Sequence, residues 1–273
     1  MFLSLLVLIL GVPKLPLMYQ FGGNNGNSIA DQSITIMSYN VKSFNDKGWI
    51  IEEDLDKKII GLINEKQPDI VCIQEHNKKY KLGKDQYPFQ YEKLTNQKFE
   101  FGHIIYSKYP ILNSGSFNFE KSGNNILWAD IAIKGDTVRV YNAHLQSFKV
   151  PADFDKAQAN SERFLRRVRS AVIKQEQQVK EFVQHEKESP YPVLVAGDLN
   201  NTAFSYSYRQ VKGDKQDAFA KAGKGIGYTF LFDWYPVRID FILADPKLIV
   251  SDFETYTMKY SDHYPIMSTI SWD

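Results

Sequence analysis

This chain of 273 residues has almost no cysteine and almost no net charge. The chain has 1 cysteine, Cys72, so no disulfide can form within it. Cys72 lies in an apolar run, which predicts a small buried side chain. The 33 lysines and arginines nearly balance the 32 aspartates and glutamates, and the net charge of +1 excludes a global basic field that attracts nucleic acid. Any phosphate-binding site must therefore be local.

A long apolar run is also lacking at the N-terminus. Residues 1–10 are almost entirely apolar, but a transmembrane helix needs about 20 such residues. They resemble the core of a signal peptide, although they lack a positive n-region and a clear small-residue cleavage site. A second interpretation is the end of a membrane hairpin that begins upstream. A core helix is disfavoured because the Gly- and Asn-rich residues 21–31 are typical of a flexible linker.

These features predict a hydrophobic segment and linker over residues 1–32 and one folded domain over residues 33–273. We expect membrane association or export, and hence a place in the cell envelope. Within the domain, apolar runs and helical spacing alternate. We expect strands over 34–40, 69–74, 101–106, 126–133, 137–144, 193–196, 239–243, 253–257 and 264–270, and helices over 52–66 and about 153–188. The long second helix carries an expected apolar stripe of Phe164, Leu165, Val168, Val172, Val179 and Val183.

Polar residues recur at the ends of the apolar runs. They are Asn40, Glu75, His144, Asp198 with Asn200, Asp240, and Asp262 with His263. One such residue alone indicates little, because Asn and Asp are common turn formers at strand ends. The repetition is harder to ascribe to turns, and strand ends are where α/β proteins usually keep their chemistry.

The motifs around these residues occur in one order along the chain. They read Ser38-Tyr39-Asn40-Val41, Ile73-Gln74-Glu75, Asn142-Ala143-His144-Leu145, Gly197-Asp198-Leu199-Asn200, Arg238-Ile239-Asp240-Phe241-Ile242-Leu243 and Ser261-Asp262-His263. This series resembles the endonuclease/exonuclease/phosphatase (DNase I-like) superfamily, most closely its bacterial branch with N-terminal hydrophobic helices. The resemblance covers residues 33–273. It implies a four-layer α/β sandwich, in which helices flank two packed, mainly antiparallel sheets.

The resemblance also implies a metal site. Glu75 would be the chief ligand, Asn40 would assist it, and Asp262 would support the metal or its waters. These are hard oxygen donors, which suit Mg²⁺, with Mn²⁺ as the alternative. The competing interpretation of Glu75 is a surface acid that pairs with Lys78 or Lys79.

The remaining residues would do the chemistry. By resemblance Asp198 orients or deprotonates the attacking water, Asn200 donates hydrogen bonds to the phosphate, and His144 is a phosphate-facing imidazole. His263 would pair with Asp240, since a carboxylate favours the cationic form of the ring. Asp198 and Asn200 project to the same side of an extended chain, but they also suit the cap of a following helix.

The expected activity is a divalent-metal-dependent phosphoesterase that hydrolyses phosphodiesters or phosphomonoesters by direct attack of water. Its substrate would be a phospholipid headgroup, an inositol phosphate or nucleic acid. The alternatives are a nuclease for DNA or RNA outside the cytoplasm and a non-catalytic module that binds phosphorylated ligands. Lys42 stands where AP endonucleases usually carry an acid, which disfavours an abasic-site nuclease. Arg238 suits either a phosphate contact or a structural ion pair.

Overall fold

Two six-stranded sheets form the body of the protein. The computed structural model describes residues 11–22, 33–96, 100–120, 122–148, 161–232 and 235–272. The first sheet has the strand order β15 (Ile249–Thr255), β16 (Ile266–Ser271), β2 (Ser33–Asn40), β3 (Ile70–Asn77), β5 (Phe101–Ser107) and β4 (Phe89–Asn96). The second has the order β10 (Gln216–Asp217), β14 (Asp240–Ala244), β9 (Val193–Asp198), β8 (Asp136–His144), β7 (Ile126–Ile133) and β6 (Ile111–Ser116).

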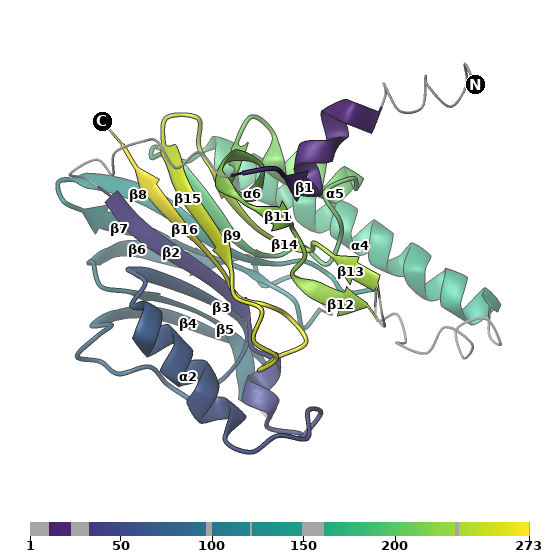
Figure 1. The fold of residues 1–273 in the computed structure, drawn as a ribbon, viewed down its shortest axis with the longest axis horizontal. Helices are drawn as coiled ribbons and strands as arrows, with labels where there is room; N and C mark the ends of the chain where they lie inside the picture. Colours follow the sequence, from purple (N-terminus) through teal and green to yellow (C-terminus); the bar gives the residue numbers. More distant parts are fainter. Residues whose placement is uncertain are drawn as a thin grey trace.

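Each sheet contains one parallel pair among antiparallel neighbours. The parallel pairs are β2 with β3 and β8 with β9. Figure 1 shows the two sheets stacked, with α2 (Leu55–Lys66) over the outer face of the first and α4 (Ser161–Lys187) behind the second. The layers therefore run helix, sheet, sheet, helix, which confirms the fold class predicted from the sequence.

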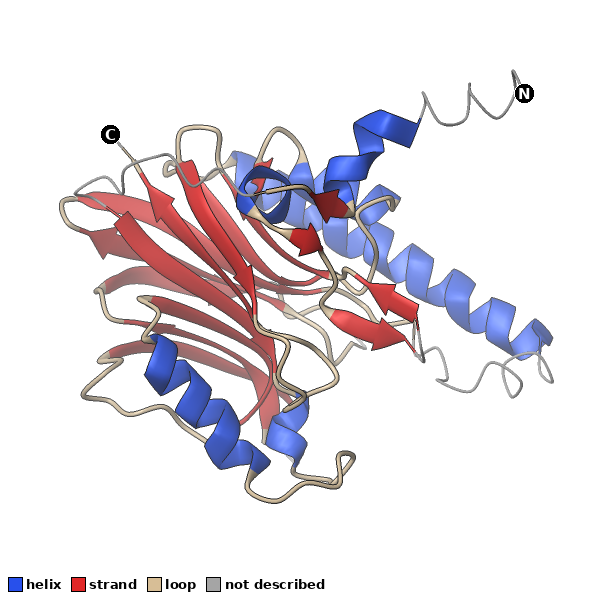
Figure 2. Cartoon of the chain, viewed as in Figure 1, coloured by secondary structure: helices blue, strands red, loops and turns tan. Residues whose placement is uncertain are grey.

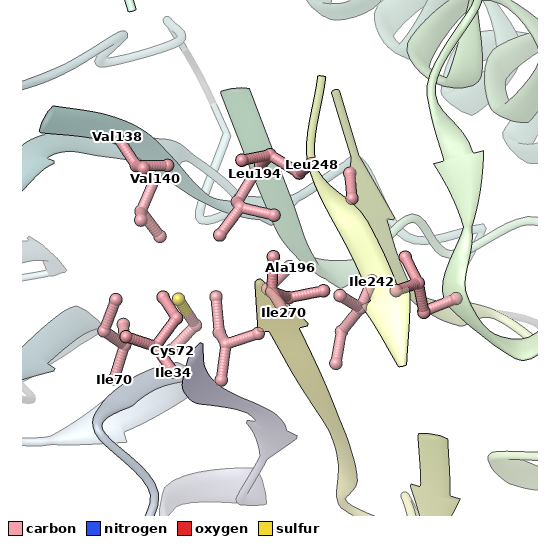
Figure 3. Packing of buried hydrophobic residues seen from close by; sticks show 14 of the residues in the cluster. Ile34, Ile70, Cys72, Val138, Val140, Leu194, Ala196, Ile242, Leu248 and Ile270 are labelled. Carbon is pink, nitrogen blue, oxygen red and sulfur yellow. The ribbon is translucent and has the colours of Figure 1, made fainter. Parts of the chain in front are cut away.

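The main core lies between the sheets. Figure 3 shows side chains of the first sheet facing those of the second, among them Ile34, Ile70 and Cys72 opposite Val138, Val140 and Leu194. Cys72 is buried, as its apolar run predicts. Separate apolar clusters fill the space under α2, where Ile59 and Ile63 are buried, and under α4, where Val179 and Phe182 are buried.

Helix α4 packs through only the C-terminal part of the expected stripe, where Val179 and Val183 contact the core. Val179 is buried, but the side chains of Leu165 and Val172 are 62% and 48% exposed. Figure 2 shows the physical reason: the N-terminal half of the helix extends past the sheets that the described residues form. The expected start of this helix, near Asp153, lies outside the described residues.

Residues 11–20 lie against the domain. They form a 3-10 helix, η1 (Val12–Leu17), and the short strand β1 (Tyr19–Gln20), which pairs antiparallel with β11 (Gly225–Ile226). Arg238 Nη2 donates to the carbonyl oxygen of Leu17 at 3.0 Å. Among the described residues, none of the helices has the length and apolar content needed to cross a membrane.

The other short elements lie around the edges of the sheets. They are the 3-10 helix η2 (Lys42–Asn45), the helices α5 (Tyr206–Lys212) and α6 (Ala218–Ala222), and the antiparallel pair β12 (Phe230–Phe232) and β13 (Tyr235–Val237). An isolated bridge between Phe230 and His263 connects the β12–β13 hairpin to the segment before β16.

Candidate active site

The predicted polar residues meet at one edge of the two sheets. Asn40, His144 and Asp198 are the last residues of β2, β8 and β9, and Asp240 is the first residue of β14. The strand register places Asp198 beside both His144 and Asp240. Because parallel strands end together, the carboxyl ends of the parallel pairs bring these side chains to a common point.

Asp198 lies at the centre of this cluster and is buried. Its Oδ2 accepts a hydrogen bond from Asn40 Nδ2 at 3.1 Å and lies 3.6 Å from His144 Nε2 and 3.7 Å from His263 Nε2. Its Oδ1 accepts the backbone N–H of Asn200 at 2.7 Å. Asp198 thus holds one carboxylate oxygen at the meeting point of two imidazoles.

The charges around Asp198 shift its pKa. Burial raises the pKa of the Asp198 carboxyl, and the nearby Asp240 adds to this, against the opposing effect of His263. A carboxylate whose pKa is raised toward neutrality binds a proton more readily than one in water. Asp198 is therefore suited to accept a proton from water.

His263 and Asp240 form a close carboxylate–imidazole pair. His263 Nδ1 lies 2.9 Å from Asp240 Oδ2 and 3.1 Å from Asp240 Oδ1. Burial alone would lower the pKa of His263, but Asp240 and Asp198 outweigh it and raise the pKa to about 10. The ring is consequently an imidazolium at neutral pH. Thr229 Oγ1 fixes the start of β14 by accepting the backbone N–H of Asp240 at 3.1 Å.

His144 has the opposite character. Burial lowers the pKa of its imidazole well below the usual value, and interactions with His103 and His263 act in the same direction. The ring of His103 packs edge-on against that of His144, with centroids 5.2 Å apart. The site therefore contains one neutral and one cationic histidine on either side of the same carboxylate.

Glu75 reaches the cluster through an irregularity in β3. The pairing of β3 with β5 shifts register between Ile73 and His76, and Glu75 has a left-handed backbone with φ of 52°. Its carboxylate lies 3.4 Å from Asn40 Nδ2 and 4.0 Å from His144 Nε2. Burial raises the pKa of this carboxyl. No hydrogen bond or ion pair to Lys78 or Lys79 is found for Glu75 within the described residues, so it belongs to the site rather than to a surface pair.

Asp262 lies beside the cluster and has a cationic partner. Lys42 Nζ donates to Asp262 Oδ2 at 2.5 Å. Ser261 Oγ donates to the backbone oxygen of Asn40 at 2.8 Å, which holds the 261–262 turn against the end of β2. In the sequence, Lys42 stands out only as a departure from AP endonucleases, and its pairing with Asp262 was not predicted. Its place two residues after Asn40 was the available signal.

Asn200 points inward in this structure. Its side-chain Nδ2 donates to the backbone oxygen of Leu145 at 3.0 Å and to Asp198 Oδ2 at 3.2 Å. These bonds position Asp198. The helix after the motif, α5, is capped by Ser205 instead, whose side chain accepts the N–H of Tyr208. Asn200 is therefore not a helix cap.

Two sets of side chains have the chemistry to hold a cation. Among the described residues, Asp198, Asp240 and His263 bring ligand atoms within 4.8 Å of one another. This set includes an imidazole nitrogen, and Nδ1 of that ring is hydrogen-bonded to Asp240; nitrogen ligands suit Mg²⁺ less well than oxygen ligands do. Asn40, Glu75 and Asp262 offer only oxygen ligands, and Glu75 and Asp262 keep 29% and 31% of their side chains exposed. A hard, partly hydrated cation such as Mg²⁺ fits this second set better.

A buried amide network supports the site from below, and sequence reasoning did not assign it. Gln74 Nε2 donates to Asn142 Oδ1 at 2.8 Å, and Asn142 Nδ2 donates to the backbone oxygens of Ile73 and Ile104. These bonds connect the two sheets directly behind Glu75 and His144. The signal in the sequence was a polar residue inside each of two otherwise apolar runs.

Arg238 has a structural role. Its guanidinium donates to both carboxylate oxygens of Asp217, at 2.9 and 2.8 Å, and both side chains are buried. The ion-pair interpretation is therefore the one the structure bears out. The arginines of α4, namely Arg163, Arg166, Arg167 and Arg169, are exposed on the projecting half of that helix.

Comparison with known proteins agrees with the fold and the motifs. The model of the Endonuclease/Exonuclease/phosphatase family matches residues 37–263. A structure of the endonuclease/exonuclease/phosphatase from Bacteroides vulgatus is 20% identical, with a TM-score of 0.68 over 89% of this chain and 100% of that one. The structure of D. rerio TDP2 complexed with single strand DNA product is 20% identical, with a TM-score of 0.66 over 88% of this chain and 100% of that one. Among the curated proteins, no match was found.

Proposed function

This chain belongs to the Endonuclease/Exonuclease/phosphatase family, and from that premise we propose that it hydrolyses phosphoric esters by direct attack of water in the presence of a divalent cation. The observation that carries the proposal is the position of Asp198 between a neutral and a cationic imidazole. Such a carboxylate can take a proton while a positive charge remains beside it.

The proposed roles follow from the geometry. Asp198, whose pKa burial raises, accepts a proton from the attacking water. His263 is held in its cationic form by Asp240 and stabilises the charge that develops on the phosphoryl oxygens. The neutral His144 is suited to a hydrogen bond with the phosphate.

The cation would be held by Glu75, Asn40 and Asp262. When bound, Mg²⁺ or Mn²⁺ supplies Lewis-acid polarisation of a phosphoryl oxygen. Lys42 keeps the Asp262 carboxylate in place beside Asn40. The hydrogen bond from Asn200 to Asp198 suits a residue that positions the Asp198 carboxylate. This role adds to the phosphate contact that the sequence predicts for Asn200.

Nucleic acid is the substrate class that the comparisons favour. The structure of D. rerio TDP2 with single strand DNA product is a relative by fold, and its ligand is a nucleic acid. Phospholipid headgroups and inositol phosphates are the other candidates. Membrane association or export stays a proposal that rests on the apolar residues 1–10, and with it a nuclease acting outside the cytoplasm.

A substrate panel tests the proposal. The full chain is assayed on supercoiled plasmid, RNA, bis-p-nitrophenyl phosphate, sphingomyelin and an inositol polyphosphate, in Mg²⁺, Mn²⁺ or EDTA. We expect turnover of at least one class that EDTA abolishes. Binding of phosphorylated ligands without turnover of any class, by a protein shown to be folded, would instead identify a non-catalytic module.

A further inference from the structure

Two cavities share Glu75 and Phe101 as a common wall. One has a volume of about 350 Å³ and is lined by Trp49 and Lys47. The other has a volume of about 390 Å³ and is lined by His144. A phosphate beside Glu75 and His144 therefore has room for substrate on both sides. A diester carries a group on each of two ester oxygens and a monoester carries one, so this arrangement fits a diester.

Trp49 is presented to its cavity by a structured loop. The side chain of Asn45 accepts the backbone N–H of Ile50 at 2.9 Å and donates to the carbonyl oxygen of Ile50 at 2.8 Å. These bonds close the loop that carries Trp49. Trp49 is 46% exposed, so part of its surface is available to a ligand. Because the loop is already ordered, an aromatic ring held in this way loses little conformational entropy when a ligand stacks on it.

Cationic groups surround the indole. Lys42 Nζ and Lys47 Nζ lie 5.3 and 5.5 Å from the ring centroid. Asp46, which also lines this cavity, is bonded to Lys79 Nζ at 3.3 Å and to Tyr80 OH at 3.0 Å. The cavity thus combines an aromatic face with nearby ammonium groups, and the carboxylates of Asp46 and Glu75 also belong to its lining.

This combination discriminates among substrate classes. A single-stranded nucleic acid provides bases that stack on aromatic rings and phosphates that pair with lysines. The quaternary ammonium of a choline headgroup also binds aromatic rings, but here the ammonium groups of Lys42 and Lys47 already lie over the indole ring. An inositol phosphate has no planar ring to place on Trp49.

We propose that Trp49 is a base-stacking platform beside the scissile phosphate, with Lys42 and Lys47 flanking the strand, and that the substrate is a single-stranded nucleic acid. The strand crosses from the Trp49 cavity over Glu75 into the His144 cavity. This inference rests on the proposed hydrolysis at Glu75 and Asp198, and it adds the substrate class and a specificity residue.

The test measures binding and turnover separately. Binding of fluorescein-labelled oligothymidylate and oligouridylate is followed by anisotropy in Mg²⁺, on the His263→Ala background to slow cleavage. Trp49→Ala is expected to raise Kd by at least about fivefold, the scale of one lost base–aromatic stack. Trp49→Phe keeps a ring and should recover part of the affinity. The matched control is Ile51→Ala, which removes a fully exposed side chain two residues away (103% exposed) and should leave Kd unchanged.

Turnover in the otherwise wild-type background separates this inference from the proposed function. Trp49→Ala should raise KM for the oligonucleotide more than KM for methyl p-nitrophenyl phosphate. The single ring of this small diester can bind on either side of Glu75, so its binding does not depend on Trp49. Equal Kd values for Trp49→Ala and Ile51→Ala would overturn the inference and leave hydrolysis standing. No turnover of any phosphoric ester, diester or monoester, would overturn the proposed function, and the anisotropy would still decide the role of Trp49. The ratio of the Kd values for oligothymidylate and oligouridylate assigns DNA or RNA as the preferred substrate.

Discussion

At the scale of single residues, two histidines beside one carboxylate differ in charge because their neighbours differ. His263 contacts Asp240 at 2.9 Å, and its pKa is raised to about 10 despite burial. Burial lowers the pKa of His144, which packs against another imidazole, His103, and not against a paired carboxylate like Asp240. The sequence predicts the first pair from its motifs, but it does not show which residue faces His144, since β5 is distant in the chain.

Asp240→Asn tests the origin of the charge on His263. The amide keeps the shape and an acceptor for Nδ1 but removes the negative charge, so the pKa of His263 falls and less of the ring is cationic near neutral pH. We expect kcat to fall by about 10²-fold or more, the scale of one lost transition-state interaction. Asp252→Asn, on the edge strand β15, removes an exposed carboxylate and should leave kcat unchanged. A wild-type kcat for Asp240→Asn would show that Asp240 does not set the state of His263.

Gly197, directly before Asp198, is required by close approach of two backbones. A Cβ at this position would lie 1.9 Å from the carbonyl oxygen of Ala143 on β8. Gly197→Ala therefore forces β8 and β9 apart, and we expect a loss of at least about 2 kcal/mol in the free energy of unfolding, within the range of overpacked sites. Gly61→Ala is the control, because nothing lies within 4 Å of the added Cβ in α2. Gly61→Ala should raise the free energy of unfolding by about 0.5–1 kcal/mol. Urea unfolding measures the stability of both variants. Equal midpoints for Gly197→Ala and Gly61→Ala would contradict the close approach of β8 and β9 at Gly197.

At the scale of elements, the central strands were predictable, but the edge strands were missed or, for β15 (Ile249–Thr255), predicted only in part over 253–257. The apolar runs of β2, β7 and β8 are buried almost throughout, and their predicted bounds agree with the structure to within a residue. The edge strands β4 and β6 were missed because their exposed positions carry polar residues that resemble loops. The stripe on α4 was wrong at Leu165, since helical spacing shows a face but not where the partner layer ends.

The amide network between β3 and β8 holds the two sheets in place behind the site. Asn142→Ala removes the donor to the carbonyl oxygens of Ile73 and Ile104 and the acceptor for Gln74. Unpaired buried groups cost about 1–3 kcal/mol each, so we expect a loss of at least about 2 kcal/mol in the free energy of unfolding. Gln177→Ala, which breaks one exposed bond to Glu181, should change stability by less than about 0.5 kcal/mol. Similar denaturant midpoints for the two variants would show that the network is not a structural link.

At the scale of the whole molecule, the site exists only because the two sheets pack together. Asn40 and Glu75 come from the first sheet, and His144, Asp198 and Asp240 come from the second. The ordered motifs predicted this family and this fold, which the comparisons confirm. Local patterns could not show that Lys42 pairs with Asp262 or that Trp49 borders the site, because these depend on loops whose course is set by tertiary contacts.

The most direct test of the central claim is kcat for Asp198→Asn against wild type, with Mg²⁺ and bis-p-nitrophenyl phosphate. The amide fits the same space but cannot take a proton from water, so kcat should fall by at least about 10²-fold, as expected for a lost general base. Thermal unfolding of both proteins would verify that the variant is folded. A folded Asp198→Asn variant with the wild-type, EDTA-sensitive rate would contradict the assignment of Asp198 as the proton acceptor and the mechanism built on it.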